Sequence, residues 1–191
     1  MISLRSLRIR LFTRDSRGAA AVEFALVTPL MLTMYFGIVE VSTGVAIDRK
    51  VTLVSRTLSD LVAQATAVNN TDISNVFNAS AAIMTPYLAS PLTAKMTAVT
   101  IDGTGKATVA CSRSWTSSGG VSTGYAKNTV VTSSVPPGLI VNNTELIWAE
   151  VSYVYTPAVG YIIKSAITLS DKFYARPRQS TTVDFSAATC S

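Results

Sequence analysis

An uninterrupted apolar run near the N-terminus constrains this chain more than any other feature. Residues 24–39 read FALVTPLMLTMYFGIV and contain no charged side chain. A helix of that length extends about 24 Å, a little less than the ~30 Å hydrocarbon core of a bilayer. The wider window 19–47 holds only two charged residues, Glu23 and Glu40, and is long enough to span. The sequence therefore predicts a transmembrane helix over residues 19–47.

A basic leader precedes the apolar run. Residues 1–18 contain five arginines and one aspartate, a net charge of +4, whereas the rest of the chain carries +1. A nucleic-acid-binding domain would gather its basic groups on a folded face, so we expect no nucleic-acid partner. Arginines before an apolar segment are typical of an anchor whose N-terminus stays in the cytoplasm, and only Arg49 and Lys50 oppose this orientation. We expect residues 1–18 to be a cytoplasmic leader, lipid to surround the helix, and residues from about 48 onward to be exported.

Two other interpretations of the apolar run stay open. The first is a cleaved secretory signal peptide, with residues 44–46 (Gly-Val-Ala) as a small-x-small cleavage site and Ile47 as the first mature residue. The mature protein would then be a secreted β-rich binding protein. The second is a buried core helix of a soluble protein, an interpretation that gives the arginine-rich leader no role.

An acidic residue stands inside the apolar window. An ionised carboxylate in hydrocarbon costs several kcal/mol unless it is shallow, protonated or paired. Glu23 follows Gly18 by five residues, so it either lies at headgroup depth or meets a positive partner. A cut after Gly18 would create an α-amino group on Ala19, and that group on a neighbouring subunit could neutralise Glu23. Glu40 can likewise lie at the outer interface or pair with a partner helix.

Two parts of the chain resemble one known family. Residues 17–29 (RGAAAVEFALVTP), followed by residues 37–40 (GIVE), resemble the opening of TadE-like proteins, which are minor pseudopilins or assembly factors of the tight-adherence (Flp) pilus. Residues 149–157 and 167–178 are similar to the C-terminal half of many TadE-like chains. The chain is too short for the von Willebrand-type insertion of the longer TadG-like proteins.

The resemblance implies specific roles and partners. A prepilin peptidase would cut between Gly18 and Ala19, and Glu23 and Phe24 would serve subunit pairing or recognition. Pilin and other pilus or secretion components would be the further partners. TadG-like proteins share this opening and need not be processed, so cleavage of the leader stays open.

Beyond the membrane segment, the pattern predicts two helices over residues 48–85. Residues 48–67 continue as an amphipathic stalk, which would pack on the exported domain or on a partner helix. Thr71 or Asp72 is expected to cap a second helix that runs through about residue 84. The residues expected on the buried faces are Val51, Val54, Leu58, Leu61, Val62 and Ala65 in the stalk, and Ile73, Val76, Phe77, Ala81 and Met84 in the second helix.

The remaining residues, 86–191, predict a β-rich domain. Short β-branched stretches alternate with turn residues, including a hairpin turn at residues 102–105. Residues 113–128 are rich in Ser, Thr and Gly and are expected to form a loop. We expect an α+β fold in which an antiparallel sheet of four or more strands packs one face against the two N-terminal helices. The candidate strands are residues 95–101, 106–112, 146–155, 167–175 and 180–185.

The composition argues against an enzyme. The chain has no histidine and two cysteines, so the usual Ser-His and Cys-His pairs are absent and a closed zinc site is implausible. We expect no cofactor, no metal and no small-molecule substrate; an exported hydrolase using Ser or Asp is a further alternative. Cys111 and Cys190 both fall in the exported part, where an oxidising periplasm permits a disulfide. Two buried or free thiols are the other possibility.

Overall fold

The computed structural model describes residues 17–157 and 165–190 and divides the chain into two units. The first helix of this part is α2 (Arg17–Ala63), which belongs to both units. Its residues as far as Ser42 lie in the first unit, and the rest lie in the second. The second unit contains residues 43–156 and 165–190. Of the predicted leader, residues 1–18, the first 16 residues lie outside the described residues, as does the segment 158–164.

The first unit consists of an apolar helical segment. It holds Pro29, which α2 accommodates without a break. The hydroxyl of Thr28 donates to the carbonyl of Phe24 at 2.7 Å, and that of Thr33 donates to the carbonyl of Pro29 at 2.9 Å. Both hydroxyls are therefore satisfied by the helix itself, which is how such groups are accommodated away from water.

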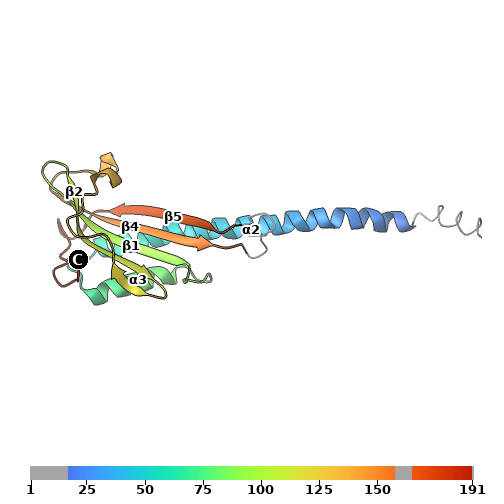
Figure 1. Ribbon diagram of the computed structural model, residues 1–191, viewed down its shortest axis with the longest axis horizontal. Coiled ribbons are helices and arrows are strands. Elements are labelled where there is room, and N and C mark those ends of the chain that lie inside the picture. Colours follow the sequence, from blue (N-terminus) through green and yellow to red (C-terminus); the bar gives the residue numbers. More distant parts are fainter. Residues whose placement is uncertain (1–16, 158–164, 191) are drawn as a thin grey trace, which may run out of the picture. The chain divides into compact units, whose positions relative to one another are not determined.

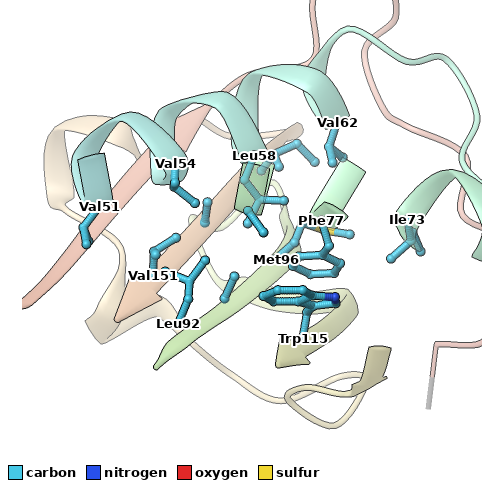
Figure 2. Close-up of a cluster of buried hydrophobic side chains, with 14 of the residues drawn as sticks. Val51, Val54, Leu58, Val62, Ile73, Phe77, Leu92, Met96, Trp115 and Val151 are labelled. Atoms are coloured by element: carbon cyan, nitrogen blue, oxygen red, sulfur yellow. The ribbon is translucent and has the colours of Figure 1, made fainter. Parts of the chain in front are cut away.

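The second half of α2 packs one stripe into the core of the second unit. Val51, Val54 and Leu58 are fully buried, whereas Leu53 on the opposite side is 51% exposed. Figure 2 shows this stripe facing side chains of the sheet. The prediction of an amphipathic continuation is confirmed. Of its two predicted packing partners, the structure shows the domain that follows in the same chain. The helix ends at Ala63, four residues before the predicted end.

A second helix, α3 (Asn70–Ala82), follows after a short turn. Its N-cap is Asn69, whose side chain accepts from the N–H groups of Thr71 and Asp72, while the Asp72 carboxylate accepts from the N–H of Asn69. The prediction of Thr71 or Asp72 as the cap was wrong, because this capping box assigns Asp72 to the third helical position. Of the predicted inner face, Ile73, Phe77, Ala81 and Met84 are buried and Val76 is partly buried.

Five antiparallel strands form one sheet in the order β3-β2-β1-β4-β5, which confirms the predicted architecture (Figure 1). The turn at residues 102–105 closes the hairpin between β1 and β2: the N–H of Asp102 donates to the carbonyl of Lys106, and Gly105 adopts a φ of +82° that suits glycine. The strands are β1 (Leu92–Ile101), β2 (Ala107–Thr116), β3 (Gly120–Thr123), β4 (Thr144–Tyr155) and β5 (Ile167–Ala175).

Two of the predicted segments were wrong. Residues 113–128 are not all loop, because β2 continues to Thr116 and turns into β3. Ser114 and Ser122 lie opposite each other on these two strands and share a 3.2 Å hydrogen bond. Residues 180–185 form no strand; only Asp184 makes a single bridge, to Ala67. Two short 3₁₀ turns, Thr132–Ser134 and Pro137–Leu139, lie between β3 and β4.

The sheet has a core on each face. One face packs against α2 and α3 through a cluster that includes Phe77 and Trp115, whose rings stack at 6.4 Å (Figure 2). The other face carries a smaller cluster around Trp148, covered by residues of the segment 125–140. Ala110 is an extra residue in β2, because Ala98 pairs with Cys111 while Val99 pairs with Val109. This bulge moves Cys111 onto the helix-covered face, and the fold is α+β as predicted.

Candidate functional site

The predicted processing and pairing residues lie in the first two turns of α2. Gly18, Ala19, Glu23 and Phe24 are all exposed, Phe24 at 72%. Apart from its chain neighbours and the backbone of its own helix, no heavy atom of the described residues would lie within 4 Å of a methyl group on Gly18. Ala19 and Glu23 are four residues apart, so they lie on one face of the helix, one turn apart. The leader that precedes them is outside the described residues, so the structure shows the exposure of this site but not its processing.

An exposed apolar surface surrounds α2 over residues 22–41. In water these side chains would be costly, whereas a lipid environment suits them. Helix α2 is the one described helix long and apolar enough to cross a membrane, and only 6% of its most apolar window is buried. The alternative of a buried core helix was therefore wrong. The exposed large side chains are Val22, Phe24, Leu26, Val27, Leu30, Met31, Leu32, Met34, Tyr35, Phe36, Ile38, Val39 and Val41.

The two acidic residues of the apolar window, residues 19–47, differ in their surroundings. Glu23 is exposed near the start of the helix, with uncharged residues from Phe24 to Val39 after it. Glu40 is 3% exposed. The carboxylate of Glu23 is therefore the one open to a partner molecule.

A disulfide ties the C-terminal segment to the sheet. Cys111 on β2 and Cys190 are joined, with their Cα atoms 5.0 Å apart and 79 residues apart in sequence. Neighbouring hydrogen bonds hold the same end: the Asn70 side chain donates to the Thr189 hydroxyl at 2.8 Å and accepts from the Thr189 N–H at 2.9 Å. Arg113 donates to the carbonyl of Thr189. The end of the chain is thus fixed to both α3 and β2.

The same segment also closes over the end of α2. The N–H of Arg178 donates to the carbonyl of Ala63 at 2.9 Å, which satisfies one of the free carbonyls at the helix end. The Arg178 guanidinium pairs with Asp60. Further along, the N–H of Val68 donates to the carbonyl of Asp184 at 2.9 Å. Residues 176–190 are therefore an integral layer of the second unit.

A buried carboxyl group that the sequence analysis missed lies beneath this layer. Glu145 of β4 is 4% exposed and accepts a 3.2 Å hydrogen bond from the N–H of Val183. Its other oxygen, Oε1, has no hydrogen-bond partner among the described residues. Burial raises the pKa of Glu145 from 4.5 to about 7, and the hydrogen bond from Val183 partly offsets the rise. Nothing in the sequence around residue 145 signalled a buried acid.

A row of charges crosses the other face of the sheet. Glu150 is 3.0 Å from Lys172 and 3.9 Å from Lys95, its neighbours on β5 and β1. The hydroxyl of Tyr125 also donates to Glu150 at 3.0 Å; burial, then this bond, raises the pKa of Tyr125. The negative charge of Glu150 is therefore paired with the two lysines, as expected of a cross-strand network that stabilises a sheet. Among residues 17–157 and 165–190, no three His, Cys, Asp or Glu side chains are grouped to hold a metal ion.

These features define a class of protein: an α+β domain with an internal disulfide, preceded in the described part of the chain by one apolar helix suited to anchoring it in a membrane. Residues 18–57 match the family model described as TadE-like protein, which confirms the resemblance to the TadE-like family over this part of the chain. The match begins at Gly18 and ends at Thr57 within α2, so the resemblance over residues 149–178 lies outside it. No curated protein and no solved structure matches the chain significantly.

Proposed function

We propose that this chain is a membrane-anchored minor pseudopilin or assembly factor of a tight-adherence (Flp) pilus or a related secretion system. The observation that carries the proposal is the exposed apolar helix, which begins where the TadE-like match begins, at Gly18. The same helix provides the buried stripe of the second unit, so the anchor and the domain share one element. The partners are then inner membrane lipid, a prepilin peptidase, pilin and other pilus components, with no nucleic acid and no small-molecule substrate. The TadE-like family is generally non-enzymatic, which supports a structural function.

The arginines and the disulfide support one orientation. The leader carries five arginines against Arg49 and Lys50 after the apolar run, so the positive-inside rule keeps the N-terminus in the cytoplasm. The second unit would then lie in the periplasm, where its disulfide between Cys111 and Cys190 can form and persist.

Processing after Gly18 would create the partner that Glu23 needs. The new α-amino group on Ala19 is cationic, and it would lie at the membrane surface one helical turn before Glu23. A carboxylate that enters hydrocarbon is stabilised by pairing with such a cation on a neighbouring subunit. Phe24, 72% exposed beside Glu23, would provide apolar contact in the same encounter.

The alternative of a secreted binding protein fits the structure less well. Its cleavage site, residues 44–46, lies in the middle of α2 rather than in an extended segment. Ile47, which would become the new N-terminus, is 2% exposed and belongs to the core. A cut there would place a charged amine beside an apolar core, which is costly.

Substitutions in the native bacterium would test the proposal. Gly18→Leu should leave the leader attached, seen as an unprocessed mass, and should abolish sheared surface filaments. Glu23→Ala should be processed at Ala19 and still fail to support filaments. Val27→Ala, which alters the same helix face one turn later without removing a charge, is the control and should assemble normally. Normal filaments with both Gly18→Leu and Glu23→Ala would overturn the pilus function.

A further inference from the structure

We propose that the anchor-side end of the second unit lies against the lipid surface through an apolar rim of four residues: Val45, Leu88, Val154 and Ile167. The proposal rests on the membrane anchoring of α2 and not on the pilus function. The anchor-side end of the second unit is identified by chain connectivity alone: it is the end at which α2 enters the unit. Thr43 follows Ser42 directly, and Thr43 is only four residues, or about 6 Å of helix, beyond Val39 at the end of the uncharged run.

The ends of β4 and β5 lie beside this first turn of the second unit. A methyl group at Gly44 would meet the ring of Tyr155 at 3.5 Å, so the last residue of β4 packs directly on α2. Tyr155 pairs with Ile167, the first residue of β5. Val154 precedes Tyr155 and points to the opposite face of the strand. Both strands therefore bring an exposed apolar side chain to the anchor side.

The loop after α3 reaches the same end. The ammonium of Lys50 donates to the carbonyls of Ile83 and Thr85, both at 2.8 Å, and so holds the loop beside α2. At the other end of the loop, the N–H of Val154 donates to the carbonyl of Pro91 at 3.2 Å. Leu88 lies between these two attachments, so the loop places it at the same end of the second unit as Val154.

The rim is apolar and open. Leu88 is 74% exposed, the same fraction as Leu26 inside the predicted membrane segment, and Val45, Val154 and Ile167 are 40–48% exposed. Isolated exposed apolar residues are common and need no explanation. Four of them at the end of a domain that a short tether holds at the bilayer are in position to contact lipid. Arg49, exposed next to the rim, can extend its charge to the headgroups.

Tryptophan substitution in the full chain, reconstituted in phosphatidylcholine nanodiscs, would test this contact. The natural tryptophans Trp115 and Trp148 are 6% and 1% exposed and give a constant background. The tryptophan of Leu88→Trp should emit at a shorter wavelength than a tryptophan exposed to water. Its emission should also decrease in discs of brominated lipid. Val130→Trp, at a site 54% exposed next to the hairpin strand β2, is the matched control and should be unaffected by bromination.

A positive control separates failure of the rim from failure of the anchor. Met34→Trp in the apolar helix should lose emission in brominated discs whenever the anchor spans the bilayer. If Met34→Trp is quenched while Leu88→Trp behaves like Val130→Trp, the rim proposal is overturned and the anchor stands. A blue shift at position 88 that depends on protein concentration and not on bromination would indicate a second copy of the chain on the rim, and it would overturn the lipid contact as well.

Discussion

Replacing Glu145 by glutamine should remove most of the pH dependence of stability in the second unit between pH 4.5 and pH 7. The wild-type carboxyl is neutral in both states below pH 4.5. As the pH rises, the unfolded chain loses this proton first, because the folded pKa is about 7, so folding stability falls between pH 4.5 and 7 and then levels off. At 1.36 kcal/mol per pH unit, the fall amounts to at most about 3 kcal/mol. Glutamine stays neutral and can still accept from the N–H of Val183.

The assay is denaturant unfolding of the full chain in detergent, followed by the fluorescence of Trp115 and Trp148, at pH 5 and pH 8. Glu145→Gln should be more stable than the wild type by up to about 3 kcal/mol at pH 8 and within about 1 kcal/mol of it at pH 5. Asp48→Asn, which removes an exposed carboxylate, controls for the change in net charge. A variant that loses stability between pH 5 and 8 as steeply as the wild type would refute the role assigned to Glu145.

Four further substitutions test the packing of the second unit. Cys190→Ser opens a long covalent loop and should lower the free energy of unfolding by about 4–5 kcal/mol on the chain-entropy model, with earlier proteolysis of the C-terminal segment. Leu58→Ala should cost about 2–5 kcal/mol, whereas Leu53→Ala, on the exposed side of the same helix, should change stability by less than about 0.5 kcal/mol. Gly124→Ala should cost about 1–3 kcal/mol, because a methyl group there would lie 2.2 Å from the Oγ of Ser112.

Controls for these changes come from the chain itself. Gly138→Ala introduces a methyl group at a glycine with no heavy atom within 4 Å of it and should leave the unfolding midpoint unchanged. Reduction of the wild type should reproduce the loss seen with Cys190→Ser. Equal stability of Leu58→Ala and Leu53→Ala would contradict the packing of α2 on the sheet.

Local patterns predicted the helices and most strands of this chain well. The spacing of Val51, Val54 and Leu58 placed the buried stripe of α2, because a helix that covers a sheet must repeat its apolar side every three to four residues. The alternation over residues 146–155 likewise identified β4 and its two faces. The exact length of α2 was not predictable, because its end is fixed by a hydrogen bond from distant Arg178.

Features that depend on strand register could not be predicted from the sequence. The grouping of Lys95, Glu150 and Lys172 exists only because β1, β4 and β5 are neighbours in a particular register. The burial of Glu145 depends on a C-terminal segment that has no regular secondary structure and packs through single hydrogen bonds and a disulfide. The same reason explains why residues 180–185 look like a strand in the sequence: Val183 is buried and Phe185 is partly buried, but no ladder of the described residues pairs with them.

The proposed function requires residues 19–47 to act as a lasting membrane anchor that begins at a processed N-terminus. Mass spectrometry of the N-terminal peptide, from protein recovered in alkali-washed membranes of the native bacterium, tests this most directly. The account predicts that the protein stays in the membrane fraction and begins at Ala19. Protein that is released in soluble form and begins at Ile47 would contradict it.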